Sequence, residues 1–190
     1  MAKGLEKFNN LIDALTNLPS VGKKSATRFA YHLVLNDPFS ALKLSHAIEV
    51  AVSSIKRCSI CRGLSEDEIC EICLDEYRED RKLCIVESAK DILVLEESSV
   101  YDGKYFVLDA LESHIIDELR SLVEQKDIEE IIFALTPSLA NDSLILFVED
   151  KLKEFDITFS KIAQGVPTGV GLENVDMLSL SKALQDRVKV

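Results

Sequence analysis

The sequence predicts a multidomain α and α/β protein: an all-helical N-terminal part, a four-cysteine metal finger, and an α/β domain with a mainly parallel four-stranded sheet and a C-terminal helical tail. Three observations support this fold class. Helical patterns fill residues 1–55, two Cys-x-x-Cys pairs lie within residues 56–77, and apolar runs alternate with helical patterns over residues 78–165. Residues 166–190 are expected to form a C-terminal segment of loop, helix and tail.

Charge is distributed unevenly along the chain. The formal net charge is −11, yet residues 21–62 carry seven basic and two acidic side chains, whereas residues 63–190 carry 13 basic and 29 acidic ones. The basic segment could meet nucleic-acid phosphates, and the acidic remainder could bind basic proteins or metal ions, or simply be solvated. No apolar run approaches the ~20 residues of a membrane span, and no signal peptide is apparent. We therefore expect a cytoplasmic protein without membrane contact.

The N-terminal part is predicted to contain three helices. Apolar side chains at intervals of three and four predict the first over residues 5–18, which Pro19 ends. Gly22 is expected to supply the permissive backbone of a tight turn, and the second helix begins directly after it. A break at residues 36–38 separates the second helix from the third, predicted over residues 39–57. The side chains expected inside the second and third helices are Phe29, Ala30, Leu33, Val34, Leu42, Ala47, Ile48, Ala51, Val52 and Ile55.

The first two helices and their short turn resemble a helix-hairpin-helix element. Backbone N–H groups near Gly22 and the positive end of the second helix would form an anion pocket. Lys23, Lys24 and Arg28 add positive charge, and Lys24 and Arg28 share one helical face because they are four residues apart. Such a pocket contacts a phosphate without reading a base. The alternative is an ordinary helical corner with solvated basic side chains.

The cysteines predict a metal site. Cys58 and Cys61 form one Cys-x-x-Cys pair, and Cys70 and Cys73 form another after eight intervening residues. This spacing is typical of a four-thiolate Zn²⁺ site that stabilises the fold, because no coordination position is left open for catalysis. The alternatives are two disulfides, which a reducing compartment disfavours, or a redox dithiol. Cys84 lies in an apolar run and is expected to be a buried small side chain.

Residues 83–163 alternate between strand-like and helix-like patterns, which is typical of a parallel sheet covered on both faces. Strands are predicted at residues 83–86, 105–108, 130–135 and 157–163. Helices are predicted at residues 89–97, 112–125 and 141–154, with Ser88 as a cap of the first. Residues 165–171 lack the Lys-Ser/Thr of a P-loop and are expected to form a turn, followed by a helix at residues 178–187 and a tail at residues 188–190 that could pair with a sheet edge.

Three carboxylates follow predicted strands. Glu87 comes after the first strand, Asp109 after the second, and Asp142 lies a loop away from the third. Ligands of parallel sheets bind at the carboxyl ends of the strands, so these side chains outline a hypothetical site for a hard cation such as Mg²⁺. The alternative is that they are ordinary loop carboxylates, which are common at such positions.

The order of these parts resembles the bacterial RecR recombination mediator family, and the resemblance covers nearly the whole chain. It rests on residues 18–28, the four paired cysteines, and residues 85–92, 103–108 and 162–169. By this resemblance the α/β part is similar to a Toprim domain, the fold shared with topoisomerases and primases.

The resemblance implies a DNA-binding recombination mediator with no catalytic residue. RecR-like proteins form dimers or ring tetramers and act with a RecO-type protein, and in many bacteria with RecF, to help load RecA on gapped or single-stranded DNA during repair. The resemblance implies that Lys23, Lys24 and Arg28 contact DNA phosphates, and that Glu87, together with Asp142, contacts partners. It also implies one structural Zn²⁺ and a location at the nucleoid.

Two loops depart from the family pattern. The loop after the second strand is shortened, and in the loop after the third strand Leu139 and Asn141 replace two family glutamates, with Asp142 one place off. These changes count against Mg²⁺ binding and against the alternative function, a Mg²⁺-dependent Toprim enzyme of the nuclease or primase kind. A further alternative is an adaptor whose DNA contact requires its complex.

Overall fold

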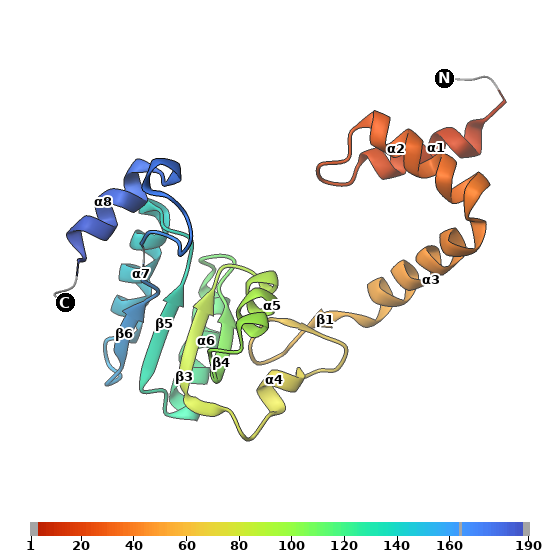
Figure 1. Ribbon diagram of the computed structural model, residues 1–190. Helices are drawn as coiled ribbons and strands as arrows, with labels where there is room; N and C mark the ends of the chain where they lie inside the picture. The colour runs from red at the N-terminus through yellow and green to blue at the C-terminus, as the bar shows by residue number, and fades with distance from the viewer. Residues whose placement is uncertain (1–3, 164, 188–190) are drawn as a thin grey trace. The chain divides into compact units, whose positions relative to one another are not determined.

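Figure 1 shows the computed structural model, which describes residues 4–163 and 165–187. The expected tail at residues 188–190 lies outside these described residues. The chain divides into two compact units, Met1–Ile55 and Lys56–Val190, so the four cysteines and the sheet belong to the same unit. Across the described ranges, no helix is long and apolar enough to cross a membrane.

The N-terminal unit is helical. Helix α1 (Glu6–Thr16) packs against α2 (Lys23–Tyr31), and a π-helical turn (His32–Asn36) leads to α3 (Pro38–Ser54). The Asp37 carboxylate caps α3, accepting a hydrogen bond from the Ser40 N–H at 3.0 Å. The core of this unit is small and lies between α1 and α2, with partly buried Phe8, Leu11, Leu15 and Val21 packed around it. Its buried residues are Ile12, Ala26 and Ala30.

Two expectations about this unit are wrong. Helix α3 ends at Ser54 rather than at residue 57, because the next residues form strand β1 (Lys56–Arg57), paired antiparallel with β2 (Leu64–Ser65). All residues of α3 are described and none is buried. Several apolar side chains that were expected inside are exposed instead, namely Phe29, Val34, Leu42, Ile48, Val52 and Ile55. The two alanines of α2 and Ile12 of α1 form the buried core of this unit, and among the described residues no side chain of α3 is part of it.

The second unit contains the predicted parallel sheet, with strand order β4-β3-β5-β6. Its strands are β3 (Glu79–Val86), β4 (Gly103–Val107), β5 (Glu130–Ala134) and β6 (Thr158–Lys161), and every pairing between them is parallel. Strand β3 begins at Glu79, four residues before the predicted start. The first half of the strand is polar and incompletely buried, so it lacks the apolar pattern on which the prediction rested. The α/β fold class predicted from the sequence is confirmed.

Helices cover both faces of this sheet. Leu83 and Ile85 point to the face covered by α6 (Ser113–Lys126) and α7 (Leu139–Leu152). Cys84 and Val86, which alternate with these two, pack against Ile92 of α5 (Ala89–Ser98). Figure 1 shows α5 on the face of the sheet opposite to α6 and α7. Cys84 is buried as expected, and burial raises its pKa to about 12. A 3₁₀ turn (Leu172–Asn174) and α8 (Met177–Gln185) follow the sheet.

Candidate metal centre and nucleic-acid interface

The four paired cysteines bring their sulfur atoms together. The Sγ atoms of Cys58 and Cys73 lie 3.9 Å apart, those of Cys61 and Cys70 lie 3.6 Å apart, and all four lie within 4.8 Å of one another. A tetrahedral site with Zn–S bonds of ~2.3 Å has S···S edges of about 3.8 Å. The donor set and its spacing therefore fit one structural zinc ion, as predicted from the sequence.

Local backbone structure builds this centre. The β1–β2 ribbon carries the first pair, and its turn is closed by a hydrogen bond from the Cys58 N–H to the Gly63 carbonyl at 2.8 Å. The second pair lies on the short helix α4 (Glu71–Leu74), for which Cys70 is the N-cap. Backbone N–H groups of Gly63 and Cys70 approach sulfur atoms of the first pair at 3.3 Å. Hydrogen bonds from these backbone N–H groups stabilise negative charge on sulfur, and therefore favour the thiolates that zinc requires.

Ion pairs join the finger to the sheet. Arg57 lies 2.6 Å from the Asp109 carboxylate, and Arg62 reaches both Asp109 at 3.3 Å and Glu118 at 2.8 Å. Arg57 is the main cause that lowers the pKa of Asp109. Sequence reasoning counted both arginines in the basic segment and missed these pairs. Because they already have carboxylate partners, the positive charge available for phosphate is concentrated in the N-terminal unit.

Glu87 is held by the loop after β5. Its Oε2 accepts hydrogen bonds from the Thr136 hydroxyl at 2.6 Å and the Thr136 N–H at 3.0 Å, and its Oε1 accepts one from the Asn141 amide at 2.8 Å. The Thr136 hydroxyl is the main cause that lowers the pKa of Glu87. Asn141 therefore stabilises the charge of Glu87 as a hydrogen-bond donor.

The three carboxylates of the hypothetical Mg²⁺ site do not come together. Asp109 pairs with arginines of the finger, Glu87 binds the Thr136 loop, and Asp142 lies 3.4 Å from Lys161. Within residues 4–163 and 165–187, the four cysteines are the only group of three or more His, Cys, Asp or Glu side chains placed to hold a metal. The described cysteines therefore fit zinc at the finger, whereas Glu87, Asp109 and Asp142 are each held by other partners and do not form a common cluster.

A pH titration tests the Glu87 contacts. Thr136→Val removes the hydroxyl donor, so we expect the pKa of Glu87 to rise toward its ordinary value, measured by carboxyl NMR. A depressed folded-state pKa stabilises the fold above the unfolded-state pKa, and this contribution disappears as pH falls through the folded-state pKa. As the pH is lowered, Thr136→Val should therefore lose less stability than the unaltered protein does. Thr136→Ser retains the donor and is the control; equal Glu87 pKa values in both variants would contradict the assignment.

Two basic side chains of α2, Lys23 and Lys24, lie at its uncapped N-terminal end, and Arg28 lies in its last turn. Lys23, Lys24 and Arg28 are exposed, and none of them forms an ion pair with any residue that the structure describes. No described side chain caps α2, so the first N–H groups of the helix remain available to an anion. The Arg28 guanidinium lies 5.4 Å from the centre of the Phe29 ring, a cation–π contact that sequence reasoning missed.

The turn before α2 differs from the expectation. Ser20 adopts the left-handed backbone conformation with φ of 63°, whereas Gly22 has φ of −78° and ψ of 163°, which any residue can adopt. A Cβ atom added at Gly22 would meet nothing within 4 Å. Ser20, and not Gly22, thus adopts the left-handed conformation of this turn. The absence of a side chain at Gly22 leaves the first turn of α2 open to an approaching anion.

Comparisons with known proteins agree along the chain. The family model for the RecR helix-hairpin-helix matches residues 8–52, and the model for the four-cysteine zinc finger domain of RecR matches residues 55–75. "Recombination protein RecR" of Nitratiruptor sp. is 59% identical over 186 residues, covering 98% of both chains. The protein of that name from Campylobacter jejuni subsp. doylei is 55% identical over 190 residues, the full length of both. The one from Helicobacter pylori (strain Shi470) is 51% identical over 185 residues, covering 97% of this chain and 96% of the relative.

Proposed function

This chain belongs to the RecR family of recombination proteins, and from that premise we propose that it is a DNA-binding mediator of recombinational repair, which helps load a RecA-type recombinase on gapped or single-stranded DNA. The observation that carries the proposal is the similarity to recombination protein RecR over the full length of the chain. The proposed site of action is the nucleoid, in the cytoplasm.

The first turn of α2 is the proposed DNA contact. Lys23 and Lys24 lie in this turn, beside N–H groups that no described side chain caps, and Arg28 adds a charge further along the same helix; no described carboxylate neutralises any of the three. One such site would bind weakly, because the net charge of the chain is −11. A dimer or ring tetramer would place several copies along one DNA molecule and add their contacts.

The sheet unit is the proposed partner surface, for a RecO-type protein and, where the organism has one, RecF. Asp142 lines an open groove of about 370 Å³ together with Glu149, Phe159 and Lys161. Acidic groups beside apolar surface suit a partner that presents basic and apolar side chains. Glu87 contributes less directly, because both of its oxygen atoms already accept internal hydrogen bonds, and its proposed role is to position the loop that leads to Asp142.

The same geometry favours a mediator over a Mg²⁺-dependent nuclease or primase. Enzymes of that kind need carboxylates that hold metal ions against the reacting phosphate. Here Glu87 faces the amide of Asn141, and Asp109 faces two arginines. We accordingly assign no residue a catalytic role.

The test is binding to an end-labelled gapped duplex in Mg²⁺ across a salt series, with and without the RecO-type partner. The same samples are run on a denaturing gel. We expect intact DNA and salt-sensitive binding that the partner strengthens. Cut or extended DNA that disappears in Glu87→Gln would overturn the mediator proposal and make the sheet unit an enzyme.

A further inference from the structure

Lys104 is a buried lysine at the junction between the finger and the sheet. Only 9% of the residue is exposed, and every residue of its strand β4 is buried, although β4 lies at an edge of the sheet. At the opposite edge, the residues of β6 are exposed or half-buried. Burying an ammonium group is unfavourable unless its hydrogen bonds are satisfied, so its partners indicate its role.

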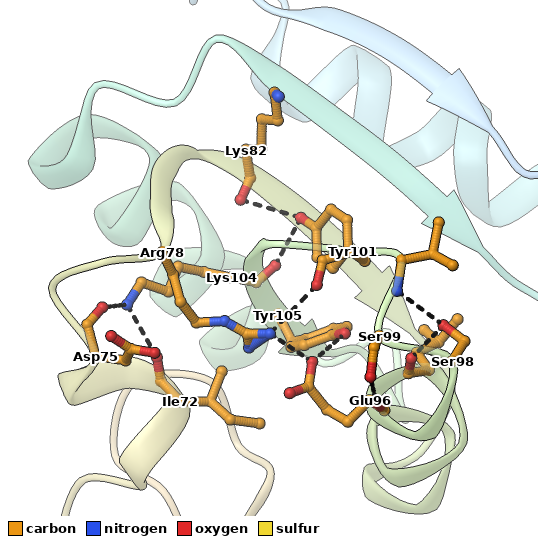
Figure 2. A network of polar contacts seen from close by, with 12 residues as sticks. Ile72, Asp75, Arg78, Lys82, Glu96, Ser98, Ser99, Tyr101, Lys104 and Tyr105 are labelled. Carbon is orange, nitrogen blue, oxygen red and sulfur yellow. Dashed lines mark hydrogen bonds and ion pairs between the residues drawn. The ribbon is translucent and has the colours of Figure 1, made fainter.

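The Lys104 ammonium binds the end of α4, the helix that carries the second cysteine pair. It donates to the carbonyl oxygens of Ile72 at 2.9 Å and Asp75 at 2.5 Å, and lies 3.4 Å from that of Cys73 (Figure 2). Asp80 balances the charge at 3.4 Å. Carbonyls at a helix C-terminus have no partner within the helix, and a lysine can supply three donors. Lys104 therefore holds the backbone of a zinc ligand against β4.

Neighbouring side chains hold the same junction in place. The Tyr101 hydroxyl lies 3.0 Å from the Lys104 carbonyl and 3.1 Å from that of Lys82, which fixes β4 next to β3 (Figure 2). Arg78 directly precedes β3 in the chain. It pairs with Glu96 of α5 at 2.6 Å and lies over the Tyr105 ring. The lysine is thus attached to a fixed part of the sheet.

The first cysteine pair also contacts this strand. The Val107 N–H donates to the Cys61 carbonyl at 2.9 Å, and Ile72 packs against the cluster that contains Tyr105 and Val107. Both halves of the metal centre therefore lie on β4. An uncovered strand edge is a template for pairing with other chains, and here the finger occupies it.

We propose that Lys104 is a positioning residue of the zinc centre: its ammonium fixes the second cysteine pair against β4, so that the zinc-loaded finger covers the outer edge of this strand and zinc loss uncovers it. The coupling works in both directions. Zinc stabilises the covered edge, and the docked finger increases the affinity for zinc by the same factor, because the coupling between two binding equilibria is reciprocal.

The first test is competition for zinc with a chelator, followed with a metallochromic dye. Lys104→Met preserves length and removes the donors, and we expect the affinity for zinc to fall about tenfold to a hundredfold, the range typical of groups that orient metal ligands. Lys82→Met is the matched control, because that lysine lies on adjacent β3 and its ammonium bonds no described residue. A folded Lys104→Met protein that binds zinc with wild-type affinity would overturn the proposal.

The second test uses the unaltered protein, so it does not depend on folding of the variant. Amide hydrogen exchange is compared before and after chelation at Val107, on the covered edge, and at Ile131, in central strand β5. We expect Val107 to lose protection while Ile131 retains it. Unchanged protection at Val107, or equal loss at both amides, would contradict a metal-dependent cover of the β4 edge.

Discussion

Removal of zinc should lower the melting temperature of this protein by about 10–20 °C. Metal binding supplies about 10–16 kcal/mol in isolated zinc-finger peptides, where folding and binding are one event. Only part of that energy can reach the sheet, through the contacts of Arg62, Val107 and Lys104. Even about 5 kcal/mol is a large fraction of a domain's stability and corresponds to a shift of this size for a chain of about 190 residues.

Calorimetry of chelated and zinc-loaded samples measures the shift. Cys61→Ser removes one ligand and should lose zinc and melt at the lower temperature. Cys84→Ala is the matched control, because this cysteine is buried in the sheet and is not one of the four clustered sulfur atoms. It should retain zinc, and any decrease in its melting temperature should come from the altered packing of the sheet core alone. A metal-free sample that melts like the native one would refute the structural role of the ion.

Features that depend on near neighbours in the sequence were predictable. Each Cys-x-x-Cys pair puts two sulfur atoms on one turn, so the spacing alone predicts zinc. Strands buried on both faces are near-continuous apolar runs, which predict a parallel sheet. Ser88 caps α5 as predicted, and Asp91 completes the capping box.

Contacts between distant residues were not predictable in this way. Lys104 binds carbonyls that precede it by 29 to 32 positions, and a lysine is by default expected at the surface. Arg62 and Asp109 are likewise 47 residues apart. Helix α3 shows a second reason. Its sequence pattern predicts a helix with an apolar face, but a pattern within one helix does not identify which other element, if any, packs against that face. Leu42 and Val52 remain exposed.

Replacing both Lys24 and Arg28 by alanine should weaken DNA binding roughly tenfold or more at low salt and by the same factor for every DNA sequence. Phosphate contacts release counterions, so the slope of log K against log salt should become less steep by about two. Alanine favours helices, and both side chains are exposed, so α2 should stay folded. Fluorescence anisotropy with gapped duplexes of unrelated sequence, each across a salt series, measures both quantities.

The control must remove the same charge from the same unit. Lys7→Ala with Lys43→Ala removes two exposed positive charges from α1 and α3 and leaves those of α2 unchanged. If general attraction of the basic unit for DNA caused the binding, both double variants would lose affinity equally, and the proposed phosphate pocket would be wrong. If the pocket is the contact, the control should keep most of its affinity and its salt slope, because Lys24 and Arg28 still contact the phosphates. A loss restricted to one DNA sequence would instead indicate base contacts, which a phosphate pocket does not make.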